Sequence, residues 1–288
     1  MNNKDWEIIK LLYEEKSIKN VAIKQFLTQP AVTYRIKQIE EYLETKIIIR
    51  GRKGVEFTQQ GMYLVRYAKK MLFELNKLKQ NIQKVDNEVK GILRIGVASN
   101  FARYKLPNIL KAFREQYPKV EFKLITGWSS EIIPLLQDGE VHLAIIRGEY
   151  NWSGEKILLH QENVSIVSRH FFDLNKLPHI GRIHYKTDSF LSKTIADWWQ
   201  SRFIYPPKIT MEVDHISTCI EMVKNGLGYG IFPDISLDLF NNEIKHHIIK
   251  LTDNNNQIIE RNSWLLYRQE SLELTIVKVF VDHITKYI

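Results

Sequence analysis

Polar, planar and basic side chains are concentrated between Thr28 and Lys37. An amide can pair with adenine, a guanidinium or ammonium group with guanine or phosphate, and a hydroxyl with phosphate. These residue types therefore suit recognition of double-stranded DNA, with Gln29 placed to read bases. The candidate contact residues in this run are Thr28, Gln29, Pro30, Thr33, Tyr34, Arg35 and Lys37.

The apolar residues of the same run predict a helix over about residues 29–43. They recur at spacings of four, three and four, which places them on one helix face: Val32, Ile36, Ile39 and Leu43. Thr28 is a suitable N-cap, and the fixed φ of Pro30 suits the first turn. With the apolar face turned inward, the polar residues are left on the other faces.

Two shorter helices are expected before this one. Residues 5–15 carry an apolar stripe behind Asp5, which could act as the N-cap. Ser17 can cap a second helix, from Ile18 to Phe26, whose apolar face is Ile18, Val21, Ala22 and Phe26. Two tightly joined helices, the second of which exposes polar residues, match the requirements for entry into a major groove.

Two short strands are expected around a turn at residues 51–54. The turn carries Arg50, Arg52 and Lys53, so the segment from Ile47 to Thr58 reads as a basic β-hairpin. Such a hairpin can contact phosphates or the minor groove beside a recognition helix. Residues 1–60 are therefore interpreted as a winged helix-turn-helix domain.

The distribution of charge supports this interpretation. Residues 1–90 hold 18 Lys and Arg against 11 Asp and Glu, whereas the remaining residues hold 23 against 22. A localised cationic surplus is expected of a phosphate-binding surface. Solvation of a Lys-rich helical segment is the alternative explanation of the charge alone.

Residues 61–90 are predicted to form one long helix. The segment contains no proline, and its apolar residues alternate spacings of four and three: Leu64, Ala68, Met71, Leu75, Leu78, Ile82, Val85 and Val89. A narrow apolar seam needs a partner surface, which a second copy of the chain can supply. Packing along the chain's own second domain is the alternative.

Residues 91–288 show alternating strand and helix patterns, which imply parallel α/β structure in two lobes. We expect lobe I at about 91–163 and 264–288, and lobe II at about 164–263. The fold class is thus multi-domain α/β.

Within lobe II the pattern predicts a helix over residues 216–224 and a strand over residues 229–233. Ligands of two-lobed α/β units bind at the carboxyl ends of strands, where helix N-termini present free N–H groups. The effector site is therefore expected at the strand ends of both lobes.

Six residues at these predicted strand ends are candidates for binding a small-molecule effector. They are Ser99, Asn100, Ser129, Arg147, Thr218 and Arg261. Two arginines, hydroxyls and helix N-termini would suit a carboxylate. For Ser99 and Thr218, helix capping is the alternative role.

The sequence gives little support to other classes of protein. We see no phosphate loop or zinc-protease motif, and Cys219 is the single cysteine, so no enzyme, metal site or bound cofactor is expected. Residues 226–230 lead from a helix into a strand, the reverse of a dinucleotide fingerprint. No apolar run reaches a membrane-spanning length and no signal peptide is recognised, so a cytoplasmic location without membrane contact is expected.

The N-terminal 60 residues resemble the DNA-binding domain of LysR-type transcriptional regulators. The resemblance rests on Val21–Ala22, Thr28–Thr33, Ile36–Glu40, Leu43, Arg50 and Thr58–Gly61. The long helix, Gly91 and Gly226–Pro233 also match, so the resemblance covers essentially the whole chain. One departure is Ile47–Ile49, where the family usually has a phenylalanine.

The resemblance implies a dimer of dimers on two adjacent DNA sites, whose effector changes the DNA bend. Arg147, Arg261 and Val213–Cys219 are similar to a citrate-responsive branch of the family, which makes citrate or a related organic acid the first candidate effector. The runner-up interpretation is a two-lobed small-molecule binding protein without a role on DNA. Such a protein would not need the basic helix-turn-helix.

Overall fold

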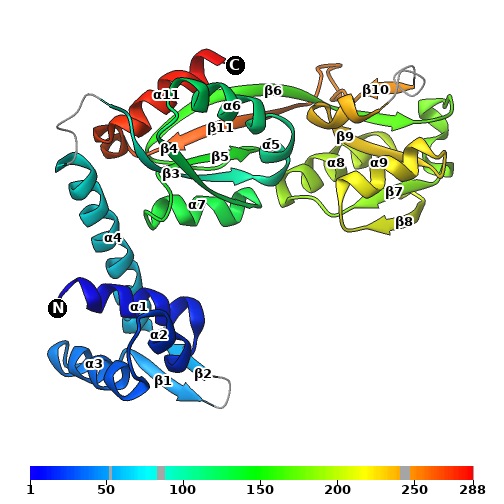
Figure 1. Ribbon diagram of the computed structural model, residues 1–288. Helices are drawn as coiled ribbons and strands as arrows, with labels where there is room; N and C mark the ends of the chain where they lie inside the picture. The colour runs from blue at the N-terminus through cyan, green and yellow to red at the C-terminus, as the bar shows by residue number, and fades with distance from the viewer. Residues whose placement is uncertain (52–53, 83–87, 241–246, 288) are drawn as a thin grey trace. The chain divides into compact units, whose positions relative to one another are not determined.

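The computed structural model describes residues 1–51, 54–82, 88–240 and 247–287 (Figure 1). Arg52, Lys53 and Val85 from the predicted sets lie outside the described residues. The chain divides into two compact units: Met1–Glu88 with Leu135–Val141, and Val89–Pro134 with His142–Ile288. After the roles that the resemblance implies, they are called the DNA-binding unit and the effector unit below.

The DNA-binding unit has the expected order of elements. It contains α1 (Asn3–Glu15), α2 (Ile18–Lys24), α3 (Gln29–Tyr42), β1 (Ile48–Gly51), β2 (Gly54–Phe57) and α4 (Gln59–Ile82). The predicted inward residues Val32, Ile36 and Ile39 are buried in one core with residues of α1, α2 and α4. Thr28 caps α3 by accepting a hydrogen bond from Ala31 N at 3.3 Å.

Two predictions at the helix ends are wrong. The N-cap of α1 is Asn2, and Asp5 lies inside the first turn as the reciprocal member of a capping box. Phe26 does not join the buried face of α2, because the helix ends at Lys24 and Phe26 takes a left-handed φ of 54°. Its side chain is 96% exposed.

The hairpin is locked to its neighbours by backbone contacts. Val55 N donates to Lys16 O at 2.9 Å, and a Cβ on Gly54 would lie 2.5 Å from that same oxygen. Ile47 and Ile48 are buried where the family usually has a phenylalanine, so aliphatic residues fill that position. The two strands pair antiparallel from Ile48 to Phe57, as predicted.

Thr58 and Gly61, which the family resemblance includes, have structural roles at the start of α4. Thr58 Oγ1 accepts from Gly61 N at 3.0 Å and donates to Lys46 O at 2.8 Å. A Cβ on Gly61 would stand 2.0 Å from Ile47 O, so only glycine permits this approach. Thr58 and Gly61 together fix the long helix to the hairpin.

The long helix is shorter than predicted. It is described to Ile82, and residues 88–90 are not helical. Val89 therefore leaves the predicted seam and packs against the core of the effector unit. Leu64 and Ala68 are buried within the DNA-binding unit, whereas Leu78 is 55% exposed.

Lobe I of the effector unit is a mixed sheet covered by helices. Its strands, in the order β4-β3-β5-β11-β6, are β4 (Val120–Gly127), β3 (Gly91–Ala98), β5 (Leu143–Arg147), β11 (Glu260–Tyr267) and β6 (Glu155–Ser168). The helices are α5 (Ser99–Tyr104), α6 (Leu106–Gln116), α7 (Ser129–Gln137), η4 (Gln269–Glu273) and α11 (Thr275–Tyr287). β3, β4 and β5 are parallel, but β11 runs antiparallel to β5 and β6. The expectation of a parallel sheet is therefore right only for one half of the lobe.

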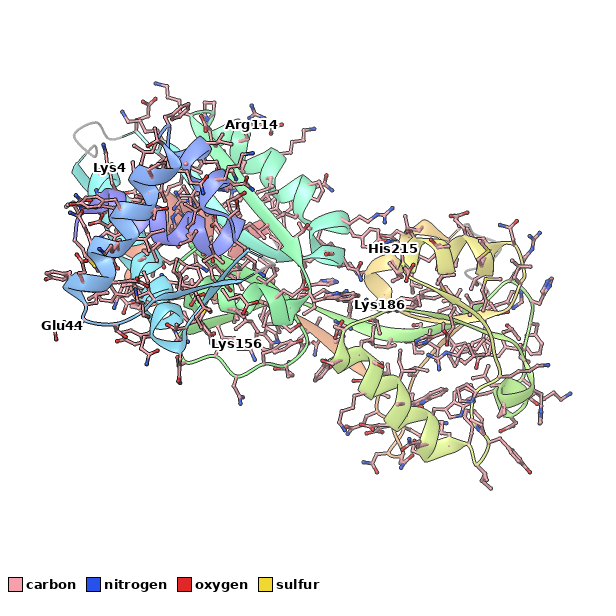
Figure 2. All side chains as sticks on the ribbon, turned by 90° about the horizontal axis from the view of Figure 1, so that it is seen from below. Lys4, Glu44, Arg114, Lys156, Lys186 and His215 are labelled. Atoms are coloured by element: carbon pink, nitrogen blue, oxygen red, sulfur yellow. The ribbon has the colours of Figure 1, made fainter. Side chains whose placement is uncertain are left out.

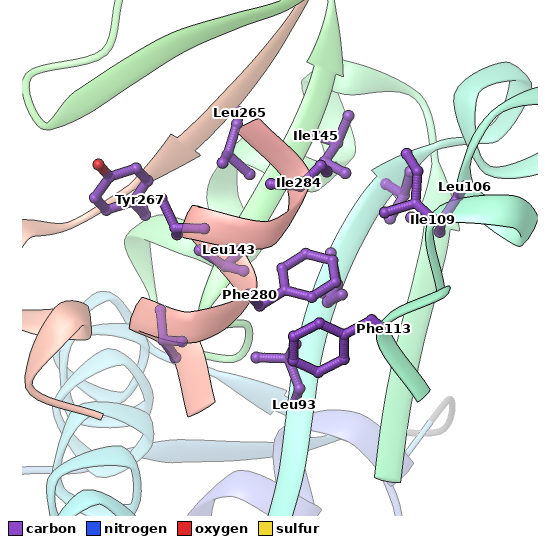
Figure 3. Close-up of a cluster of buried hydrophobic side chains, with 14 of the residues drawn as sticks. Leu93, Leu106, Ile109, Phe113, Leu143, Ile145, Leu265, Tyr267, Phe280 and Ile284 are labelled. Carbon is purple, nitrogen blue, oxygen red and sulfur yellow. The ribbon is translucent and has the colours of Figure 1, made fainter. Parts of the chain in front are cut away.

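The core of lobe I lies between the sheet and two helices far apart in sequence. Phe113 of α6 and Phe280 of α11 meet edge to face with ring centroids 5.0 Å apart (Figure 3). Leu93 and Leu143 from the central strands are fully buried in the same cluster. The C-terminal helix thus completes the first lobe, as the sequence pattern predicts.

Lobe II shares the long strand β6 with lobe I. Its strands are β9 (Tyr229–Pro233), β7 (Arg182–Tyr185), β8 (Ile209–Val213) and β10 (Ile248–Lys250), in the order β6-β9-β7-β8 with β10 on β6. The helices are η2 (Leu174–His179), α8 (Ser189–Arg202), α9 (Ile216–Lys224) and η3 (Asp234–Leu239). Figure 1 shows β6 running from one lobe into the other. The return strand β11 begins at Glu260, where it pairs with Asn163 of β6, and it pairs with β5 of lobe I from Ser263 onward.

Candidate functional sites

The exposed face of α3 carries most of the predicted DNA contacts. Gln29, Tyr34 and Lys37 are exposed, and Thr33 is half-buried. Thr28 and Pro30 are exposed at the start of the helix. Lys37 Nζ lies 3.5 Å from Oε1 of Glu41, and both side chains of this ion pair are exposed to solvent. The structure therefore leaves most of the predicted contact residues of α3 accessible to solvent.

Arg35 occupies a different place from the one predicted. Its guanidinium makes a two-pronged ion pair with Asp5 of α1, including Nη2 to Oδ2 at 2.9 Å, and Nη1 donates to Gln38 Oε1 at 2.8 Å. Asp5 is only 1% exposed. Hydrogen bonding to Asp5 raises the pKa of Arg35. This ion pair therefore gives Arg35 a structural role, in which it holds α3 on α1.

Glu40 links the recognition helix to the hairpin, a role that the sequence did not reveal. Its Oε1 accepts hydrogen bonds from Ile47 N at 3.0 Å and Ile48 N at 3.4 Å, and its Oε2 from Lys46 Nζ at 2.8 Å. Burial alone would raise the pKa of Glu40, but these hydrogen bonds outweigh it and hold the pKa below its ordinary value. The orientation of the hairpin thus depends on an ionised Glu40.

A crevice of about 510 Å³ lies between the two lobes of the effector unit. Five of the six predicted effector residues line it: Ser99, Asn100, Ser129, Arg147 and Arg261. They come from the ends of β3, β4 and β5 and from β11, so the strand-end prediction locates a real cavity. Thr218 does not line it and is exposed; the neighbouring Ser217 does. Ser217 lies in the first turn of α9, which faces the crevice.

Both buried arginines of the crevice have carboxylate partners within the protein. Arg147 forms an ion pair with Glu162 of β6, and the two side chains are 2% and 1% exposed. Glu162 Oε2 also accepts from Ile235 N of η3 at 2.5 Å. Burial and the nearby Arg261 lower the pKa of Arg147, against the effect of Glu162. Glu162 therefore links the end of β5 in lobe I to η3, which follows β9 of lobe II.

Arg261 makes the equivalent connection on the return strand. Its Nη2 donates to Asp188 Oδ2 at 2.5 Å, while the other carboxylate oxygen of Asp188 caps α8 through Leu191 N at 3.0 Å. Nε and Nη1 of Arg261 and Nε of Arg147 are buried without a hydrogen-bond partner among the described residues. Donors thus remain available where a ligand carboxylate could bind.

Ser129 positions the backbone at Arg147. Its hydroxyl accepts from Arg147 N at 2.9 Å and donates to Arg147 O at 3.1 Å. Ser99 donates to Gly127 O at 3.3 Å, so it too braces the strand ends. Both serines hold the crevice wall in place through these bonds.

Several residues that line the crevice were missed by sequence reasoning. Arg103, Lys186 and Glu131 are exposed around it, together with Asp214 and His215 of the expected 213–219 segment. Lys186 and His215 are labelled in Figure 2 on the end of lobe II that faces lobe I. The strand β7, which positions Lys186, had no recognised pattern in the sequence. His215 is the N-cap residue of α9, but its side chain makes no capping hydrogen bond.

In the part of the chain that the structure describes, no group of His, Cys, Asp and Glu is arranged to hold a metal ion. None of the described helices is both long and apolar enough to cross a membrane.

Comparison with known proteins identifies both units. Residues 4–62 match the bacterial regulatory helix-turn-helix domain of the lysR family, and residues 86–288 match the LysR substrate binding domain. The fold and the sites thus define a DNA-binding transcription regulator with a domain for a small-molecule effector. The chain belongs to the family of LysR-type transcriptional regulators, and it is not an enzyme.

Relatives match over nearly the whole length. The chain is 41% identical to the HTH-type transcriptional regulator YraN of Bacillus subtilis (strain 168), covering 98% of this chain and 96% of the relative. It is 34% identical to YkuM of the same organism, with the same shares covered. A full-length OxyR variant from Pseudomonas aeruginosa has a similar fold, with a TM-score of 0.72 at 18% identity, covering 99% of this chain and 94% of that one. CbnR crystallised with its target DNA gives a TM-score of 0.67 at 17% identity, with both chains fully covered.

Proposed function

We propose that α3 reads operator bases through Gln29, with Thr28, Thr33 and Tyr34 on phosphate and Lys37 on guanine or phosphate. The basic residues of the hairpin contact the DNA backbone: Arg50, Arg52 and Lys53. The observation that carries the proposal is the exposed polar face of α3, whose opposite face is buried. An amide that reads adenine gives sequence preference, whereas a cation on phosphate strengthens binding to all sequences.

Quantitative gel shifts with the DNA upstream of the chain's own gene test this proposal. We expect Gln29→Ala to relax preference at one base pair by about 1–3 kcal/mol, and Arg52→Gln to weaken all sequences and flatten the salt dependence. Lys19→Gln, an exposed charge on α2, is the matched control. Unchanged operator preference in Gln29→Ala would remove Gln29 from base readout.

For the effector, we propose an organic acid, with citrate as the first candidate, bound in the crevice. The free donors of Arg261 and Arg147 support this proposal, together with the exposed Arg103 and Lys186 and the opening of α9. Charge-assisted hydrogen bonds from a guanidinium are the strong interactions available to a carboxylate. Because Glu162 and Asp188 already neutralise the two arginines, affinity depends on the exposed cations as well.

Thermal unfolding in the presence of di- and tricarboxylates tests the effector proposal. A ligand at about 100 times its Kd should stabilise the protein by about 2.7 kcal/mol. Lys186→Gln should reduce the shift, whereas Lys193→Gln, on the exposed side of α8, should leave it unchanged. If no carboxylate shifts the transition, or if Lys186→Gln and Arg103→Gln together have no effect, the crevice does not bind this class of ligand.

We propose that α4 joins two copies of the chain, and that two such dimers bind adjacent DNA sites. Leu78 is 55% exposed, and Met71 and Leu75 are half-buried along the same seam. Leu75→Asp with Leu78→Asp should yield monomers in light-scattering measurements, whereas Glu74→Gln on the exposed side should not. A dimer that persists in the double variant would place the interface elsewhere.

The alternative of a small-molecule binding protein without a role on DNA leaves residues 4–62 without a function. These residues match a DNA-binding family domain, so the regulator is the better interpretation.

A further inference from the structure

Lobe II contains a second cavity, of about 250 Å³, between the strand β7 and the helix α8. Its wall is mainly apolar: Ile195, Trp199, Pro206, Pro207 and Ile231 line it. Ligand sites usually measure about 300–1,000 Å³, so this cavity limits an occupant to a compact molecule. Neither the proposed effector crevice nor the DNA-binding surface uses it.

A cation lies buried in this apolar cavity. Arg182, the first residue of β7, lines the cavity and is only 8% exposed. Its Nε is buried without a hydrogen-bond partner, and no carboxylate of the described residues forms an ion pair with it. Arg147 and Arg261, the buried arginines of the crevice, each have such a partner. Unlike those two arginines, Arg182 is therefore buried without a carboxylate partner among the described residues.

The groups that surround Arg182 do not compensate its charge. Its electrostatic neighbours are Tyr229, Tyr185 and Cys219. Burial raises the pKa of each of the three, to about 12 for Cys219, so they are neutral at physiological pH. His184, on the same strand, has its pKa lowered by burial and adds no negative charge. An unpaired buried charge is costly, so the site favours an anion supplied from outside the chain.

We propose that this cavity is a second effector site, for a compact monocarboxylate with an apolar body. The carboxylate binds the Arg182 guanidinium, and the hydrocarbon part packs on Trp199, Ile195 and the two prolines. A single cation accounts for one carboxylate, and the apolar wall disfavours a second. The cavity thus selects a class of acid different from the di- and tricarboxylates proposed for the crevice.

The position of the cavity allows its occupant to affect the crevice through shared wall residues. Tyr185 and Thr187 line both cavities, at the end of β7 and just beyond it. A ligand that orders this segment alters the wall from which Lys186 and Asp188 reach the crevice. Binding at the second site therefore changes the affinity of the first, and the coupling is reciprocal.

Titration of the full-length protein with apolar acids tests the site. The probes are phenylacetate, cyclohexanecarboxylate and 4-methylpentanoate up to about 10 mM, a range that detects millimolar dissociation constants, with neutral phenylacetamide as the matched control. Binding is followed by calorimetry and by tryptophan fluorescence, because Trp199 lines the cavity. We expect saturable binding of at least one acid and at least tenfold weaker binding of the amide.

Two variants separate a binding role of Arg182 from a structural one. Arg182→Met should abolish acid binding while leaving the melting temperature unchanged or higher, because it removes an unpaired buried charge. Ala196→Phe, at the exposed rim of the cavity, should block binding in a folded protein. Lys186→Gln, in the crevice, should retain it.

Three results would each overturn the proposal. The first is no saturable binding of any of the three acids to the wild-type protein. The second is unchanged affinity in Arg182→Met. The third is a large fall in melting temperature for Arg182→Met, which would show that the guanidinium already has a stabilising partner. Failure of citrate to bind the crevice would leave all three results unaffected.

Discussion

Replacing Glu162 with Gln removes the charge that neutralises Arg147. Glu162 is 4% exposed and uses both carboxylate oxygens, one on Arg147 and one on Ile235 N. Both partners are donors, so the amide nitrogen of a glutamine must face one of them. Arg147 would remain buried without a counter-charge. Breaking such a pair by removing one partner destabilises a protein by about 3–5 kcal/mol.

The expected change is large enough to measure by thermal unfolding. For a domain of this size, 1 kcal/mol corresponds to about 2–4 °C, so Glu162→Gln should lower the melting temperature of the effector unit by about 6–20 °C. Tryptophan fluorescence follows this unit selectively, because Trp6 is the only tryptophan of the sequence outside it.

Two controls make the result specific. Glu221→Gln removes a carboxylate that is 61% exposed and pairs with Lys224 on the surface, so it should change stability by less than about 1 kcal/mol. The double variant Arg147→Met with Glu162→Leu removes both charges and should recover most of the loss. A melting temperature within about 2 °C of wild type for Glu162→Gln would refute the view that this buried pair stabilises the effector unit.

Three further predictions concern the other parts of the chain. Gly61→Ala should destabilise the DNA-binding unit by about 1–3 kcal/mol and reduce its affinity for DNA, because the new Cβ would collide with Ile47 O. Urea unfolding measures the stability and gel shifts measure the affinity; wild-type values in both would contradict the prediction. Arg35→Met should lower stability by about 1–3 kcal/mol by removing the cationic partner of the buried Asp5 carboxylate, an effect that Lys37→Met should not produce. Burial lowers the pKa of His142 to about 3, so the unfolded chain takes up a proton first as pH falls below about 6.5. Stability should then fall by up to about 1.4 kcal/mol per pH unit down to about pH 3, and His142→Asn should flatten this slope in urea titrations.

The local elements of the DNA-binding unit could be predicted from sequence because their signals are periodic and short-range. Val32, Ile36 and Ile39 define the inward face of α3 by spacing alone, and Thr28 marks its start. The same reasoning located α9 and β9 to the residue. It failed at Phe26, because α2 ends at Lys24 and Phe26, two residues later, takes a left-handed φ outside the helix.

The sequence by itself determined the elements of the DNA-binding unit and their order, the excess of basic residues there, the strand ends that line the crevice and the family. Only the tertiary structure decided which charges are free. Arg35 pairs with Asp5 across 30 residues and Arg261 with Asp188 across 73, while Arg182 has no such partner among the described residues. Spacing along the chain fixes the face of a helix or strand on which a side chain lies. The partner it meets there depends on strand register and helix packing between distant segments, which no local pattern encodes.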